Sequence, residues 1–255
     1  MNIIAGPCVI ETGDMALSLA REIKKISDNL GIEIIFKASF DKANRSSVNS
    51  YRGLGMERGI DVFKLIKRKV DIKIITDIHE SCQAKPVSQA VDILQIPAFL
   101  CRQTDLLAAA ASTGKIIAVK KGQFLSPDDM RNVVDKLRHF DAKHIWLMER
   151  GTFFGYNRLV NDMTAIPIMK GFDVPVIFDA THSVQRPGGL GESSGGNREF
   201  VGPLAKAATA IGADGLFFEV HHNPDKALSD GANMLKISEL APLLREILAI
   251  RKVVV

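Results

Sequence analysis

Short runs of apolar residues recur along the chain at intervals that suit alternating strands and helices. Most of each run is continuously apolar rather than alternating, which is typical of strands buried on both faces of a parallel sheet. The eight runs are NIIAG from Asn2, EIIFKASF from Glu33, IKIITDIHE from Ile72, VDILQIPAF from Val91, KIIAVKKG from Lys115, HIWLMERG from His144, PVIFDATH from Pro175 and GLFFEVHH from Gly215.

Amphipathic stretches separate these runs. Residues 15–31, MALSLAREIKKISDNLG, predict a helix with Gly31 as its C-cap. Residues 126–140, SPDDMRNVVDKLRHF, predict a helix with Ser126 as the N-cap and Pro127 at the first helical position. Eight strand-and-helix units in 255 residues match one closed (β/α)8 TIM barrel, an α/β fold, with residues 1–255 as a single domain. A doubly wound open sheet is the alternative, because spacing alone does not show closure.

Composition and charge narrow the class of protein. With 46% hydrophobic and 24% charged residues, the chain resembles an ordinary soluble globular protein. The 33 basic and 29 acidic residues are scattered, so neither nucleic acid nor a membrane surface is an expected partner. Three cysteines without a CxxC pair favour a reducing cytoplasm. The first residues, MNIIAGPCVIE, lack the basic region of a signal peptide and break at Gly6-Pro7.

Polar side chains stand at the end of nearly every predicted strand. In a barrel these ends face one rim, where active sites are built. Any single one could be a strand residue meeting water, but so many are hard to explain as solvation. They are Cys8, Lys37, Ser39, Asp77, His79, Glu80, Gln95, Lys120, Lys121, Glu149, Arg150, Asp179, His182, Glu219, His221 and His222.

The basic members of this rim predict a site for anions. We expect them to converge on phosphate and carboxylate oxygens, and their number favours two anionic groups over one. The donor-rich segment DKANRSS, residues 41–47, belongs to the same prediction, although a solvated turn is its plainer alternative. The converging cations are Lys37, Lys42, Arg45, Lys120, Lys121 and Arg150.

A second set of side chains has the chemistry of metal ligands. Cys8, His182, Glu219 and Asp230 come from the first and the last two predicted units, which are neighbours only if the barrel closes. A thiolate, an imidazole and two carboxylates suit Zn²⁺, Fe²⁺ or Mn²⁺. No two of these residues fall within a short motif, so the spacing alone favours a buried structural cysteine and a helix-capping Asp230 over a metal site.

Ten motifs together resemble the 3-deoxy-D-manno-octulosonate 8-phosphate synthases, also called 2-dehydro-3-deoxyphosphooctonate aldolases. They are AGPCVIE, FKASFDKANRSS, YRGLG, TDIHE, QIPAFLCRQTDLL, KKGQFLSP, ERGTFFGYN, FDATHSVQRPGG, GGNREF and ALSDG, and they span nearly the whole chain. The resemblance implies a (β/α)8 barrel, commonly a homotetramer. It also implies a transferase that condenses phosphoenolpyruvate with arabinose 5-phosphate and water, releasing phosphate, on the route to the Kdo of lipopolysaccharide.

The resemblance also implies a role for individual residues. Lys120 and Arg150 would hold the phosphate of phosphoenolpyruvate, with Lys37, Ser39 and Lys42 near its carboxylate. Asn44 would contact a sugar hydroxyl, and Arg45 and Ser46 the distal phosphate of the sugar. Asp77 would contact sugar hydroxyls, Gln95 would support a substrate, and Arg102 would reach the site of a neighbouring subunit.

The same resemblance favours the metal site over a structural role for these residues. Metal-dependent members carry cysteine where metal-independent members carry asparagine, and the matching position here is Cys8. We therefore expect a divalent ion, with Zn²⁺, Fe²⁺ and Mn²⁺ all open, held by Cys8, His182, Glu219 and Asp230. The candidate catalytic residues are Cys8, Lys42, His182 and Asp230.

Two further expectations concern loops and ends. The glycine-rich segment Arg186 to Glu199 follows the seventh strand and is predicted to be a lid over the catalytic rim, with a merely flexible loop as the alternative. Family members often begin with an additional hairpin under the barrel. We expect less cover there in this chain, with Met1 or Asn2 nearly buried.

Three rival functions remain open at this point. A 3-deoxy-D-arabino-heptulosonate 7-phosphate synthase would use erythrose 4-phosphate, but it typically has a KPR-type motif where this chain reads KANRS, so Asn44 favours the five-carbon sugar. A non-catalytic phosphosugar-binding barrel would have no reason to keep the four ligand-type residues. A Schiff-base aldolase would need an isolated lysine in an apolar pocket, and none is evident.

Overall fold

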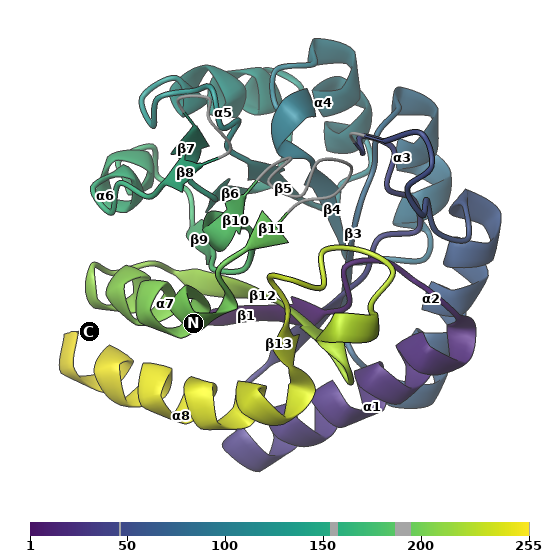
Figure 1. The fold of residues 1–255 in the computed structure, drawn as a ribbon. Coiled ribbons are helices and arrows are strands. Elements are labelled where there is room, and N and C mark those ends of the chain that lie inside the picture. The colour runs from purple at the N-terminus through teal and green to yellow at the C-terminus, as the bar shows by residue number, and fades with distance from the viewer. Residues whose placement is uncertain (46, 154–157, 187–194, 255) are drawn as a thin grey trace.

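Eight parallel strands form a closed barrel at the centre of the protein. The computed structural model describes residues 1–45, 47–153, 158–186 and 195–254. Each strand pairs with the next along the chain, and β1 also pairs with β12, which closes the ring and excludes the open sheet (Figure 1). The strands are β1 Asn2–Gly6, β2 Ile34–Lys37, β3 Ile74–Asp77, β4 Ile93–Ile96, β5 Ile116–Lys120, β6 His144–Glu149, β9 Val176–Asp179 and β12 Gly215–His221. All eight predicted runs are confirmed as strands.

Helices surround the barrel in the order of the chain (Figure 1). They are α1 Gly13–Leu30, α2 Met56–Val70, α3 Ser81–Ser88, α4 Thr104–Ala111, α5 Met130–His139, α6 Ala165–Lys170, α7 Val201–Ala210 and α8 Ile237–Val254. Gly31 ends α1 in the left-handed region with φ 64°, as the sequence predicts. This arrangement confirms the (β/α)8 barrel.

The predicted start of α5 is wrong by three residues. The helix begins at Met130 rather than Pro127. Ser126 Oγ accepts a hydrogen bond from the backbone N of Asp129 at 3.2 Å and donates to Asp129 Oδ2 at 2.9 Å. These reciprocal bonds hold residues 126–129 as a separate turn, so the α-helix starts after it.

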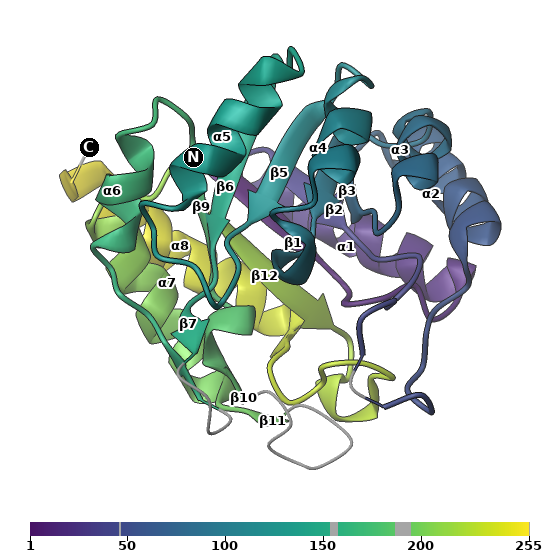
Figure 2. The same cartoon turned by 90° about the horizontal axis from the view of Figure 1, so that it is seen from above.

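Short elements line the side of the barrel on which the strands end. The pairs β7 Thr152–Phe153 with β8 Leu159–Val160, and β10 Gln185–Arg186 with β11 Gly195–Gly196, are antiparallel. Figure 2 shows β7, β10 and β11 together on this side. The remaining elements are β13 Leu235–Lys236 and the 3-10 turns η1 Ala98–Leu100, η2 His182–Val184, η3 Arg198–Phe200 and η4 Pro224–Lys226.

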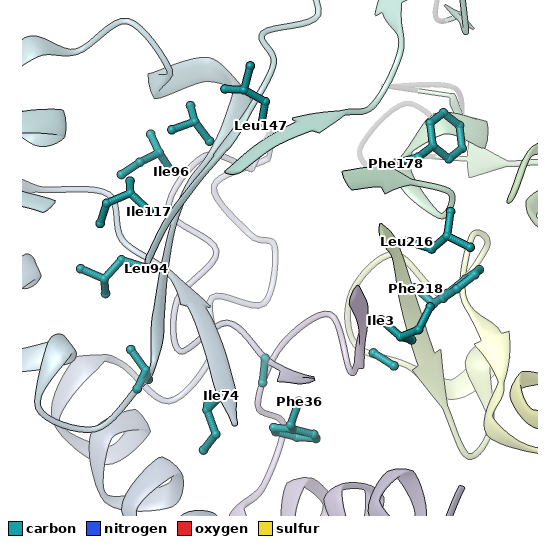
Figure 3. Packing of buried hydrophobic residues seen from close by; sticks show 14 of the residues in the cluster. Ile3, Phe36, Ile74, Leu94, Ile96, Ile117, Leu147, Phe178, Leu216 and Phe218 are labelled. Carbon is teal, nitrogen blue, oxygen red and sulfur yellow. The ribbon is translucent and has the colours of Figure 1, made fainter. Parts of the chain in front are cut away.

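Apolar side chains pack on both faces of the strands. The inner layer takes one residue from each strand: Ile4, Ile35, Ile75, Ile93, Ala118, Met148, Ile177 and Phe217. Alternate residues, including Phe36, Leu94 and Phe178, point away from the barrel toward the helices (Figure 3). Because neighbouring side chains of a strand face opposite ways, two apolar layers require a continuous apolar run. Full burial of each large side chain contributes roughly 1.5–3 kcal/mol.

The chain start differs from the expectation. Met1 and Asn2 are only partly buried, so their predicted near-burial is wrong. The backbone N of Asn2 donates to Asp214 O at 2.9 Å, so this residue lies at the start of the β1–β12 pair. Among the described residues, no helix is both long and apolar enough to cross a membrane.

Candidate active site

A ring of polar side chains lies directly above the inner apolar layer. Each position is two residues beyond a member of that layer, so its side chain also faces the barrel interior. We call this set the polar ring: Lys37, Asp77, Gln95, Lys120, Arg150, Asp179 and Glu219, with Gly6 at the eighth position. Every one of the seven side chains is buried. Buried charges require partners, so a ring of them marks a site rather than a core.

The polar ring opens into a cavity of about 770 Å³. This volume lies within the usual range for small-molecule sites. Ten of the predicted site residues line it: Lys37, Lys42, Asn44, Arg45, Asp77, Gln95, Lys120, Arg150, His182 and Asp230. The closed barrel therefore brings residues from both ends of the chain to one cavity.

One side of the cavity floor is a hydrogen-bonded network around Asp77. Ser39 Oγ donates to Asp77 Oδ1 at 2.5 Å, and His79 Nε2 lies 3.1 Å from Asp77 Oδ2. Lys37 Nζ lies 2.9 Å from Ser39 Oγ and 3.4 Å from Glu219 Oε1. Burial opposes ionisation of Asp77, but Lys37 and the His79 hydrogen bond outweigh it, so the pKa of Asp77 is held well below its usual range. Asp77 is therefore a carboxylate that can accept hydrogen bonds from hydroxyl groups.

The opposite side is built around Asp179. Lys120 Nζ lies 2.5 Å from Asp179 Oδ2, and the backbone N of His182 donates to Asp179 Oδ1 at 2.9 Å. His182 Nδ1 lies 2.8 Å from Asp179 Oδ2. Burial lowers the pKa of His182 despite the neighbouring carboxylate, which favours the neutral, metal-binding imidazole.

Cys8, Glu219 and Asp230 form a cluster of metal-ligand type. One ligand atom from each lies within 4.8 Å of the others. Cys8 Sγ is 3.4 Å from Asp230 Oδ2, and His182 Nε2 is 3.6 Å from Glu219 Oε1 and 3.9 Å from Asp230 Oδ2. Ligand atoms around a tetrahedral ion with bonds of 2.0–2.3 Å are about 3.3–3.8 Å apart. Three of the four predicted ligands therefore form the cluster, and His182 lies outside this group of three but close to two of its members.

The electrostatics of this cluster also suit a cation. Glu219 Oε2 is buried and has no hydrogen-bond partner within the described part of the chain. Burial and the nearby Glu219 raise the pKa of the Cys8 thiol to about 11. A bound divalent ion would give the oxygen a partner and favour the thiolate, so the residues present fit a metal.

Arg150 is linked to the same cluster through Gln185. Arg150 Nη2 donates to Gln185 Oε1 at 2.9 Å, and Gln185 Nε2 donates to Asp230 Oδ1 at 3.3 Å. Burial lowers the pKa of both Arg150 and Lys120, and for Lys120 the nearby Lys37 adds to the effect. Because buried like charges repel, an anion between these cations would be strongly favoured.

The prediction that Lys121 joins the converging cations is wrong. Lys121 follows Lys120 on the strand and therefore points outward, where Nζ donates to Thr152 Oγ1 at 2.9 Å and lies 3.7 Å from Glu149 Oε1. Glu149 likewise faces the helix layer rather than the cavity, while Arg150 faces inward. The alternation of side chains along a strand separates both neighbouring pairs.

Arg102, Ser46 and the predicted lid have different outcomes. Arg102 is exposed and does not line it. Ser46 lies outside the described residues. The same is true of residues 187–194 in the predicted lid, whose flanks are β10 and β11.

Sequence reasoning left two cavity-side residues without a role. Asp179 was recognised only as a strand end, although its place three residues before His182 is a signal for a carboxylate that supports a histidine. Gln185 follows in the same FDATHSVQRPGG motif, but its spacing alone does not point to Arg150 or Asp230.

Comparison with known proteins agrees with this site. The model of the DAHP synthetase I family matches residues 1–252. A 2-dehydro-3-deoxyphosphooctonate aldolase from Synechococcus sp. is 55% identical over 254 residues, which are 100% of this chain and 89% of the relative. Proteins of the same name from Cyanothece sp. and Rickettsia canadensis are each 57% identical, covering 98% and 95% of this chain and 91% and 88% of the relatives.

Proposed function

This chain belongs to the DAHP synthetase I family, and we propose that it condenses phosphoenolpyruvate with D-arabinose 5-phosphate and water to form 3-deoxy-D-manno-octulosonate 8-phosphate and phosphate. The observation that carries this proposal is that buried cations line one cavity, which a metal-type cluster adjoins through Asp230. The full-length relatives named 2-dehydro-3-deoxyphosphooctonate aldolase support the same product.

The reaction forms one carbon–carbon bond and releases phosphate. C3 of phosphoenolpyruvate attacks the aldehyde carbon of the sugar, water adds to C2, and the C2–O bond to phosphate breaks. The enzyme is therefore a transferase with phosphoenolpyruvate as donor. Lysine amines act as charges in this scheme, which agrees with their contacts to carboxylates in the cavity.

The buried cations would neutralise the two anionic substrates, which otherwise repel one another. We assign Lys120 and Arg150 to the phosphate of phosphoenolpyruvate and Lys37, Ser39 and Lys42 to its carboxylate side. Burial tends to lower the pKa of Lys42, but the acidic groups of Cys8, Glu219 and Asp77 raise it overall, so this side chain is a permanent cation.

The sugar side of the cavity would be formed by the remaining predicted residues. We assign Asp77 and Asn44 to sugar hydroxyls, Arg45 and Ser46 to the distal phosphate, and Gln95 to a supporting contact. Asn44, Arg45, Asp77 and Gln95 line the cavity.

A divalent ion held by Cys8, His182, Glu219 and Asp230 completes the proposed site. Such an ion, Zn²⁺, Fe²⁺ or Mn²⁺, would supply Lewis acidity toward the aldehyde oxygen or the attacking water. His182 presents Nε2 to this position, and Lys120 lies 3.4 Å from its Nδ1, so the metal ligands adjoin the phosphate-binding cations.

The heptulosonate synthase activity is the less favoured alternative. The matching family model carries that product in its description, but the full-length relatives at 55–57% identity carry the octonate name. Asn44 in KANRS also favours the five-carbon sugar, because heptulosonate synthases typically read KPR there.

We further propose a cytoplasmic homotetramer, with residues 1–255 as one catalytic domain. Arg102 is exposed outside its own cavity, and the nearby side chains of Phe99 and Phe124 are 51% and 49% exposed. Exposed aromatic side chains at a rim suit a protein interface. Arg102 would then reach the sugar phosphate in a neighbouring subunit.

A phosphate-release assay tests these proposals. The enzyme is supplied with phosphoenolpyruvate and either arabinose 5-phosphate or erythrose 4-phosphate, before and after treatment with a chelator. We expect release with the five-carbon sugar, loss after chelation and recovery with a divalent ion. Activity with only the four-carbon sugar would overturn the substrate, and full activity after verified metal removal would overturn the metal.

A further inference from the structure

The carboxylate of Asp179 joins two cavity residues that come from different strands. Lys120 ends β5, and His182 begins the η2 turn after β9. Asp179 is fully buried and accepts from Lys120 Nζ at 2.5 Å and from the backbone N of His182 at 2.9 Å. The distance from His182 Nδ1 to Asp179 Oδ2 is 2.8 Å. One carboxylate therefore serves three donors.

The contact with Nδ1 decides which nitrogen of the His182 ring carries the proton. An ionised carboxylate only accepts hydrogen bonds, so Nδ1 donates and Nε2 keeps its lone pair. That lone pair faces Glu219 Oε1 and Asp230 Oδ2 at 3.6 and 3.9 Å. Three electron-rich atoms so arranged suit a bound cation, and Asp179 orients the His182 ring toward that position.

The contact with Lys120 places an acceptor between two neighbouring donors. Lys120 Nζ lies only 3.4 Å from His182 Nδ1, and both atoms carry protons. Two donors at this distance repel unless one acceptor lies between them, and Asp179 Oδ2 is that acceptor. The ammonium is also held 4.3 Å from the centre of the Phe217 ring, which restricts it further.

We propose that Asp179 is a positioning residue that sets both the ammonium of Lys120 and the Nε2 lone pair of His182. Its single carboxylate thereby links the site for an anionic phosphate group to the site for a divalent cation. This inference rests on the proposed function for the identity of the two ligands. Which nitrogen of the His182 ring carries the proton does not depend on the proposed function.

The substitution Asp179→Asn keeps the shape of the side chain and removes one acceptor. In the position of Oδ2, the new amide NH₂ meets both the Lys120 ammonium and Nδ1 of His182, so the ammonium is displaced and the ring proton moves to Nε2, where it blocks metal binding. In the position of Oδ1, the NH₂ meets the backbone N–H of His182 and displaces the turn that carries the ring. In both orientations Lys120 and His182 lose the charged acceptor that they share, so both sites are damaged.

The test uses metal-free wild-type protein and the D179N variant. Competition with a coloured chelator measures Zn²⁺ affinity, and calorimetry measures binding of phosphoenolpyruvate. We expect D179N to lose about 10–100-fold in Zn²⁺ affinity and about tenfold or more in phosphoenolpyruvate affinity. Nitrogen NMR of the six histidines should show His182 protonated at Nδ1 in the wild type and altered in D179N.

Glu149→Gln is the matched control. Glu149 is also a buried carboxylate at the end of a barrel strand, with Lys121 3.7 Å away, but it faces the helices. We expect E149Q to leave both affinities within twofold of the wild type.

The outcomes separate this inference from the proposed function. Wild-type protein that binds neither ligand would count against the function, while the His182 spectrum would still test the proton position. Normal ligand binding by D179N would overturn the role of Asp179, and loss of only one affinity would overturn the link between the sites. If D179N does not fold, the wild-type spectrum decides, because His182 protonated at Nε2 would overturn the proposal.

Discussion

The guanidinium of Arg45 makes a bidentate contact with the carboxylate of Asp230. Nη1 lies 2.7 Å from Oδ1 and Nη2 lies 3.0 Å from Oδ2, while Nη2 is also 3.3 Å from Cys8 Sγ. Arg45 thus supplies positive charge where two of the proposed metal ligands meet. One guanidinium cannot hold these groups and the distal phosphate of a sugar at the same time. Metal binding should therefore release Arg45 toward the sugar.

Replacing Arg45 should affect the two ligands in opposite directions. We expect Arg45→Ala to bind Zn²⁺ several-fold more tightly, because no internal cation competes for Asp230 and Cys8. The KM for arabinose 5-phosphate should rise about 10–100-fold, since a charge-assisted contact to phosphate is lost. Chelator competition and initial rates measure the two effects.

Arg52→Ala is the matched control for this prediction. Its guanidinium pairs with Asp41, with Nε 2.6 Å from Oδ1, and it does not line the cavity. R52A should leave both constants near their wild-type values. Weaker Zn²⁺ binding by R45A would contradict the idea that Arg45 competes with the metal.

Lys120 and Lys121 are adjacent, but their substitutions should have different consequences. Lys120 faces the cavity, so Lys120→Met should weaken binding of phosphoenolpyruvate about 10–100-fold. Lys121 is buried on the outer side of its strand, where it contacts Thr152 and Glu149, so Lys121→Met should leave that binding unchanged and lower the free energy of unfolding by about 3 kcal/mol. Calorimetry and chemical denaturation of both variants test this. Equal effects on ligand binding would contradict the assigned orientations.

The same lysine pair shows what the sequence can and cannot predict. The eight apolar runs were enough to predict the barrel strands, and the barrel placed their polar ends at one rim. Each run is apolar on both faces, however, so it does not reveal which alternate residues point inward. Once Ala118 is known to lie inside the barrel, Lys120 must follow it inward and Lys121 must not.

Loop and support residues were harder to predict. Arg45 is a long side chain on a loop, and the sequence does not say whether it reaches an external phosphate or the internal Asp230. The role of Asp179 could have been predicted from the sequence, because a carboxylate three residues before a candidate ligand histidine can fix the orientation of its ring. The role of Gln185 could not have been predicted in this way, since its contacts depend on how β10 lies against Arg150 and Asp230.

Stability of the metal-free protein should depend on the protonation of Cys8 at high pH. Burial and the charge of Glu219 raise the pKa of Cys8 from 9.0 to about 11. The folded state then binds this proton more tightly than the unfolded state, so its stabilising effect is complete below pH 9 and is lost as pH rises through 11. A rise of this size corresponds to about 3 kcal/mol.

The measurement is chemical denaturation between pH 8 and pH 12, at about half-unit steps, with chelator present. Cys8→Ala should lack the part of the loss that belongs to the thiol, whereas the exposed Cys82→Ala should retain the wild-type profile. Identical pH profiles for C8A and wild type would show that the Cys8 thiol is not the responsible group.

Gly6 is the position of the polar ring that has no side chain, and the neighbouring strand explains why. A Cβ atom at Gly6 would lie 1.9 Å from the carbonyl oxygen of Lys37 and 2.8 Å from its carbon. Gly6→Ala must therefore push β1 and β2 apart where Lys37 enters the cavity. We expect a loss of about 1–3 kcal/mol in the free energy of unfolding, together with weaker binding of phosphoenolpyruvate.

Gly202→Ala in α7 is the control for Gly6→Ala, because its Cβ would meet only Leu243 Cδ1 at 3.5 Å. The helical alanine should raise stability by up to about 1 kcal/mol. A G6A protein as stable as the wild type would contradict the close approach of the two strands.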